Sequence, residues 1–126
     1  MKVLFVKADD RVRAVQIFTK MHNEVSFEDI KKLVPHRADM LYMPKISRLA
    51  FLYIMFFEKD SKTRPINKIA TAMVDAESGP IRGDVVIART NHLGSGAKIF
   101  ALEDHEIKSI VENMSKLTKI KIEMAK

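Results

Sequence analysis

The sequence predicts a single α+β domain in which two or three helices pack against a mostly antiparallel sheet of four to six strands. The chain has 126 residues, which is enough for one hydrophobic core and too few for two. Short apolar segments rich in β-branched and aromatic residues are interspersed with segments of helical period. No internal repeat, low-complexity tract or linker divides the chain, which indicates one unit of the mixed class.

The first two strands are expected close together at the start of the chain. Residues 2–7 place apolar side chains on both faces, which is typical of a strand in the middle of a sheet. Asp9 and Asp10 are expected to turn the chain into a second, β-branched strand over residues 11–18. The short spacing between the two segments favours a hairpin.

A helix is expected to begin at Ser26, because a serine side chain can accept a hydrogen bond from a free backbone N–H at a helix start. Glu28 and Asp29 in the first turn suit the positive end of the helix dipole. Pro35 is expected to end this helix. The apolar residues on its inner face are Phe27, Ile30, Leu33 and Val34.

The middle of the chain predicts two extended segments and a short helix. Residues 40–43 form a short apolar run, and residues 48–57 are the strongest strand in the sequence. A polar loop over residues 58–64 leads to Pro65, which suits the first position of a helix. We expect a helix over residues 66–74 whose inner face consists of Ile66, Ile69, Ala70 and Met73.

The last third of the chain predicts one further strand and a closing helix. Glycines mark a turn before a strand at residues 84–89, and residues 91–97 read as a glycine-containing loop. The acidic first turn of the helix contains Glu103, Asp104 and Glu106. Its inner face consists of Ile107, Ile110, Val111 and Met114.

The end of the chain changes period. We divide the sequence into an α+β domain over residues 1–117 and a C-terminal strand or tail over residues 118–126. In the tail, apolar residues alternate with charged ones at every second position, which favours a strand over a continued helix. Such a strand would pair with its own sheet or with the edge of a partner or a second copy, so it offers a route to a homo-oligomer.

The composition excludes several classes of site and compartment. Cysteine is absent, which excludes disulfides, thiolate metal sites and cysteine nucleophiles. The longest apolar run, residues 49–57, is far shorter than the roughly 20 residues that cross a bilayer. The first residues also lack the apolar core of a signal peptide. We therefore expect a cytoplasmic protein without a membrane partner.

No catalytic, metal or cofactor site is predicted. The four histidines are never three or four residues apart, so no helix face presents two of them to a metal ion. A catalytic-base interpretation of His105 is outweighed by a solvated, acidic helix start. Residues 94–98 lack the glycine spacing and the following Ser or Thr of a phosphate-binding loop. We therefore do not expect an enzyme.

Positive charge is the main indication of a partner. Lysine and arginine number 22 against 16 aspartates and glutamates, which gives a net charge of +6 and a pI near 9.6. This excess favours nucleic acid or an acidic protein surface as the partner. The aromatic residues are few and concentrate in the strand at residues 48–57, which argues against stacking on nucleic-acid bases.

One segment carries a family resemblance. Residues 64–71, RPINKIAT, are similar to the proline–x–asparagine stretch of a small uncharacterised domain family found among accessory genes of bacteriophages and mobile elements. The strand FLYIMFF, the segment GDVVI at residues 83–87 and the helix start FALEDHEI at residues 100–107 resemble further parts of that family. The resemblance extends over residues 1–114 and implies a protein that acts by binding.

The resemblance and the charge together lead to an expected function. We expect a non-enzymatic accessory protein that binds a host or defence-system macromolecule in the host cytoplasm. A nucleic-acid-binding protein is the first alternative, and a small-ligand sponge or hydrolase is the second. The predicted partner-binding residues are Lys62, Arg64, Asn67, Lys68 and Arg82. Two plainer interpretations stay open: the cations form a solvated loop, and Asn67 forms a turn with its side chain bonded to the backbone.

Overall fold

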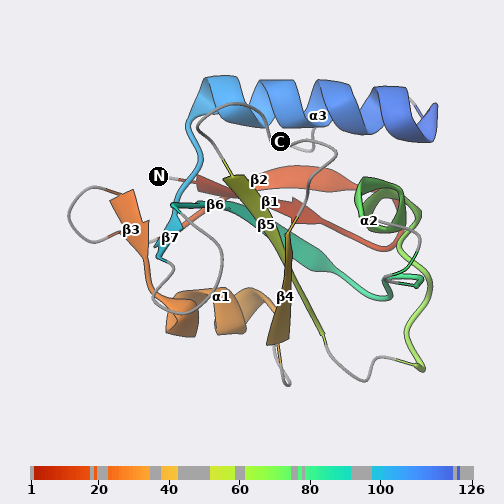
Figure 1. Cartoon of the computed structure of the whole chain (residues 1–126), viewed down its shortest axis with the longest axis horizontal. Helices are drawn as coiled ribbons and strands as arrows, with labels where there is room; N and C mark the ends of the chain where they lie inside the picture. The colour runs from red at the N-terminus through yellow and green to blue at the C-terminus, as the bar shows by residue number, and fades with distance from the viewer. Residues whose placement is uncertain are drawn as a thin grey trace.

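The structure is a computed structural model that describes residues 2–17, 19, 23–34, 38–42, 52–58, 62–74, 77, 79–91, 98–120 and 122, with the backbone alone over residues 38–42. These residues form an antiparallel sheet with helices on both faces (Figure 1). The predicted single α+β domain is therefore confirmed. Several predicted features fall wholly or partly outside the described residues, among them the stop at Pro35, the strand start at residues 48–51, the polar loop at residues 59–61 and the loop at residues 92–97.

The described part of the sheet has seven strands, all in antiparallel pairs. They are β1 (Lys2–Val6), β2 (Val12–Gln16), β3 (Glu24–Val25), β4 (Ala38–Tyr42), β5 (Leu52–Glu58), β6 (Val85–Thr90) and β7 (Ile99–Phe100). The five longer strands lie in the order β2-β1-β6-β5-β4, and β3 and β7 are strands of two residues each. β5 occupies one edge of β6, so β1 and β7 share its other edge.

β1 and β2 form the predicted hairpin. The Lys7 N–H donates to the Arg11 carbonyl oxygen at 2.8 Å, and the Asp10 N–H donates to the Lys7 carbonyl oxygen at 3.1 Å. Asp10 takes a left-handed conformation with φ of 71°, which aspartate tolerates better than most residues. Because β1 also pairs with β6, it lies inside the sheet, as its two apolar faces predicted.

The three helices are α1 (Phe27–Leu33), α2 (Lys68–Met73) and α3 (Asp104–Thr118). Ser26 caps α1 as predicted, and its Oγ accepts from the Glu28 N–H at 3.1 Å. The start predicted for α2 is wrong, because Asn67 is its N-cap and Pro65 lies before the helix. Ile66 pairs with Arg82 in an isolated β-bridge and is 44% exposed, so it does not belong to the inner face of α2. No helix in the described residues is long and apolar enough to cross a membrane.

Two hydrophobic cores lie on the two faces of the sheet. α2 and α3 cover one core, and α1 covers the other (Figure 1). Alternate residues of β6 enter different cores: Val85 and Ile87 face α3, whereas Val86 faces α1. The predicted inner face of α3 is confirmed, with Val111 half-buried and Ile107, Ile110 and Met114 buried.

The C-terminal tail does not continue as a strand over the residues that the structure describes. α3 ends at Thr118, and Lys119 takes a left-handed conformation with φ of 60° that ends the helix. Ile120 and Ile122 are half-buried, and Ile122 packs against the core under α3. Of the two predicted forms, a strand or a tail, residues 118–120 and 122 show no strand in this single chain. The remaining tail residues lie outside the described set.

Candidate functional site

Two separate segments of the chain, residues 64–67 and residues 81–83, lie side by side and contain the predicted binding residues Arg64, Asn67 and Arg82. The Asn67 N–H donates to the Ile81 carbonyl oxygen at 2.8 Å, and the Gly83 N–H donates to the Pro65 carbonyl oxygen at 2.9 Å. Arg82 adds a side-chain bond from Nη1 to the Arg64 carbonyl oxygen at 3.1 Å. We call the side chains that these segments and the preceding turn present the basic surface: Lys62, Arg64, Pro65, Ile66, Lys68 and Arg82.

Asn67 lies under this surface rather than on it. Its residue is 0% exposed, so its side chain does not contact a partner directly. Nδ2 donates to the carbonyl oxygens of Val6 at 3.1 Å and Gly83 at 2.9 Å, and Oδ1 accepts from the Ala70 N–H at 3.0 Å. The backbone-bonded interpretation of Asn67 is thus the one that the contacts support. The side chain joins the start of α2 to the end of β1 and to the turn before β6.

The structure brings the four predicted cations to one region. Lys62, Arg64 and Lys68 are exposed, and Arg82 is half-buried. Arg64 Nε donates to Glu58 Oε2 at 3.2 Å. Within the described part of the chain, Lys62 and Lys68 have no acidic partner. Sequence reasoning placed Ile66 in the core and missed its exposed position among these charges.

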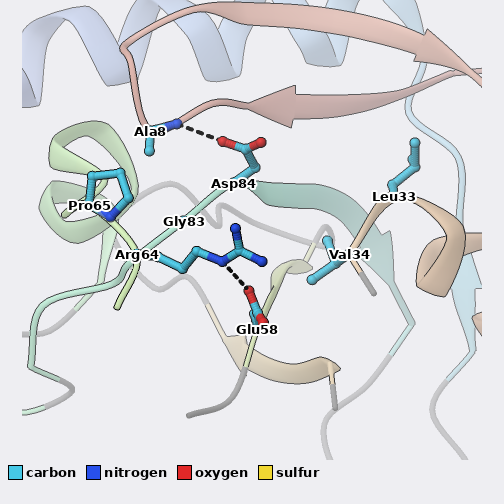
Figure 2. Close-up of a pocket in the computed structure, with 8 residues that line it drawn as sticks. All are labelled: Ala8, Leu33, Val34, Glu58, Arg64, Pro65, Gly83 and Asp84. Carbon is cyan, nitrogen blue, oxygen red and sulfur yellow. Dashed lines mark hydrogen bonds and ion pairs between the residues drawn. The ribbon is translucent and has the colours of Figure 1, made fainter. Parts of the chain in front are cut away.

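A pocket of about 330 Å³ opens beside the basic surface. It lies where the β1–β2 turn, the end of α1, the end of β5 and the start of β6 meet (Figure 2). The Asp84 Oδ1 atom accepts from the Ala8 N–H at 2.9 Å. In the view of Figure 2, the Arg64 guanidinium lies between Asp84 and Glu58. The lining residues are Ala8, Leu33, Val34, Glu58, Arg64, Pro65, Gly83 and Asp84.

Gly83 forms part of the pocket wall in a conformation that favours glycine. Its φ is +78°, which lies in the left-handed region. An added Cβ would stand 3.6 Å from Arg64 Cβ and Cγ, which is an ordinary van der Waals contact. The preference for glycine at this position therefore comes from the backbone conformation in which the chain turns into β6.

A second polar cluster lies between the sheet and α3. Tyr53 Oη donates to Glu106 Oε2 at 2.8 Å, and Arg89 Nη1 donates to Glu106 Oε1 at 3.3 Å. The Glu103 N–H also donates to Glu106 Oε1, at 3.0 Å, within a capping box. Burial and the Glu106 carboxylate raise the pKa of Tyr53 above its ordinary value. Both oxygens of Glu106 are bonded and the residue is 3% exposed, which suits a structural role that anchors α3.

Sequence reasoning missed the buried position of Glu106 and placed it in a solvated helix start. The signal that could have revealed its capping role is the spacing of three residues between Glu103 and Glu106. His105 does face solvent, with its side chain 73% exposed and Nδ1 3.3 Å from Glu103 Oε2. Among the residues that the structure describes, no group of three or more His, Asp or Glu side chains converges on a metal position.

No protein-family model, curated protein or solved structure matches this chain. The basic surface offers cations around one exposed isoleucine, and the pocket beside it offers two carboxylates and one guanidinium.

Proposed function

We propose that this chain is a non-enzymatic accessory protein of a bacteriophage or mobile element that binds a host or defence-system macromolecule through the basic surface. The observation that carries the proposal is Ile66, which is 44% exposed and flanked by cations. Protein interfaces commonly have an apolar centre with a polar, hydrated rim. The family resemblance of residues 64–71, which include Ile66, supports a binding role for the same segment.

The rigid backbone under the basic surface also supports binding. The hydrogen bonds between residues 64–67 and residues 81–83, together with the buried side chain of Asn67, hold Ile66 in one position. A surface that is ordered before binding loses less conformational entropy when the complex forms. These hydrogen bonds support a binding role for the segment over the alternative of a freely solvated charged loop.

The charge of the chain indicates an acidic partner surface. The chain carries a net charge of +6, and Lys62 and Lys68 are not neutralised by acids in the described part of the structure. Opposite charge on the partner would accelerate association and favour the correct orientation. We therefore propose an acidic protein surface with an apolar recess that accepts the isoleucine.

The test compares two exposed apolar residues on different elements. Ile66→Ser removes the proposed centre, whereas Leu117→Ser changes a residue of α3 that is equally exposed, at 43%. We expect affinity capture from nuclease-treated host lysate to recover a protein with the wild type and Leu117→Ser but not with Ile66→Ser. Circular dichroism must show both variants folded. Equal recovery with all three chains would refute the role of Ile66.

Nucleic acid is the second candidate because the cations of the basic surface would also suit a phosphate backbone. The basic surface itself carries no aromatic side chain for base stacking, which makes this candidate weaker. The dependence of binding affinity on salt concentration distinguishes a nucleic-acid partner from a protein partner. Duplex DNA binding weakens with a log–log slope of about −0.9 per phosphate contacted. Loss of all captured material after nuclease treatment would favour nucleic acid over protein.

A further inference from the structure

The pocket beside the basic surface has unused hydrogen-bonding capacity at two places. Arg64 uses Nε to bond Glu58, and within the described residues its two Nη atoms make no bond. Asp84 uses Oδ1 to accept from Ala8, and its Oδ2 is likewise unbonded there. The Arg64 side chain is 52% exposed, and Asp84 Oδ2 is not among the buried atoms that lack a partner in the described residues. The pocket thus offers free donors and a free acceptor.

The charged groups of the lining are two carboxylates, of Glu58 and Asp84, and the Arg64 guanidinium, which lies between them in the view of Figure 2. Glu58 pairs with Arg64 at 3.2 Å, whereas no cation lies within ion-pair distance of Asp84 among the described residues. Asp84 therefore offers a site for a cation. The planar Nη pair of Arg64 can form two parallel bonds to a carboxylate. The remaining side chains in the lining are apolar: Ala8, Leu33, Val34 and Pro65.

We propose that this pocket binds a small zwitterion of the amino-acid class. Its ammonium group pairs with Asp84, its carboxylate accepts from the Nη atoms of Arg64, and its aliphatic part packs on Leu33, Val34 and Pro65. A volume of about 330 Å³ lies at the lower end of the range of pockets that bind small molecules. This inference goes beyond the proposed function, since it concerns a small molecule; the pocket shares Arg64 and Pro65 with the basic surface, but Ile66 and Lys68 lie outside its lining.

The first experiment uses the full wild-type chain and follows backbone amides by NMR. The probes are leucine and a series of unbranched amino acids in which one to five carbons separate the amine from the carboxyl group. For each probe, the N-acetyl form lacks the ammonium charge and the carboxamide form lacks the carboxylate. We expect at least one zwitterion to shift the amides of Ala8 and Gly83 saturably. Each of its single-charge analogues should bind at least about tenfold more weakly, because a charge-assisted bond is lost.

Two outcomes of this titration would overturn the proposal. One is the absence of saturable shifts for every zwitterion at millimolar concentration. The other is binding of both single-charge analogues as tightly as the parent compound. Because these measurements need only the wild-type chain, they hold even where a variant fails to fold.

A pair of variants separates this site from the proposed docking function. Asp84→Asn removes the charge but keeps an oxygen that can accept from the Ala8 N–H. We expect it to weaken zwitterion binding at least about tenfold and to leave capture of the macromolecular partner unchanged. Lys68→Gln changes the basic surface outside the pocket lining. It should weaken capture of the macromolecular partner and leave zwitterion binding unchanged. Unchanged zwitterion affinity in folded Asp84→Asn would refute the ammonium site without bearing on the docking proposal.

Discussion

Replacing Asn67 with alanine tests whether this side chain holds the basic surface in place. The substitution removes the cap of α2, since the Ala70 N–H loses its acceptor at 3.0 Å. It also leaves the carbonyl oxygens of Val6 and Gly83 without the donor that now lies 3.1 and 2.9 Å away. Asn67 is 0% exposed, so water does not simply take the place of the lost amide.

The expected cost is large for one residue. Loss of a side-chain cap costs about 1 kcal/mol, and a buried carbonyl left without a donor costs about 1 kcal/mol or more. We expect Asn67→Ala to lower the free energy of unfolding by about 3–5 kcal/mol, out of a typical total of about 5–15 kcal/mol. Urea unfolding, monitored by circular dichroism, measures this difference in the free energy of unfolding when both proteins are analysed with the same dependence of that free energy on urea concentration.

Two further variants show which bonds account for the loss. Lys68→Ala changes the exposed neighbouring residue and should alter stability by less than about 0.5 kcal/mol. Asn67→Asp keeps an oxygen for the Ala70 N–H but replaces the donor with a carboxylate facing two carbonyl oxygens, so it should destabilise at least as much as alanine. If Asn67→Ala unfolds within about 1 kcal/mol of the wild type, the anchoring role of Asn67 is wrong.

Three other predictions concern pH and backbone conformation. The pKa of Tyr53 is raised in the folded state, so stability is present below the ordinary tyrosine pKa of about 10 and falls as pH rises above it. Tyr53→Phe should remove this alkaline loss in urea unfolding series, and an unchanged profile would contradict the bond to Glu106. The hydrogen bond from Arg11 lowers the pKa of Asp9, so carboxyl NMR should show a midpoint below about 3.9 that returns toward this value in Arg11→Gln. Any stability from this exposed pair is lost as pH falls through the lowered pKa. Gly83→Ala should destabilise by about 1 kcal/mol because of its positive φ, and a stability equal to wild type would refute strain there.

The local pattern of the chain was sufficient to predict the fold class and several element boundaries. The cap at Ser26, the hairpin turn at Asp9 and Asp10, and the inner face of α3 depend on residues within a few positions of one another. The central place of β1 followed from apolar side chains on both of its faces. Such features are readable because helix and strand periods act over neighbouring residues.

The candidate site depended on contacts that no local pattern contains. Asn67 is buried because its amide meets the Val6 carbonyl oxygen, 61 residues away, and the Gly83 carbonyl oxygen, 16 residues away. The bridge between Ile66 and Arg82 lies just before the Asn67 cap, so α2 begins only at Lys68 and Ile66 is exposed, against its helical spacing.

Burial of polar and tail residues was likewise decided by the tertiary structure. Glu106 is buried because the Tyr53 hydroxyl, 53 residues earlier, satisfies one of its oxygens. Ile122 packs against the core under α3, although the alternation around it predicted a strand. The sequence by itself determined the class of fold, the capped start of α1 at Ser26 and the excess of positive charge. Only tertiary packing decided which polar residues are buried and which apolar residue is exposed, because burial depends on groups brought together from distant parts of the chain.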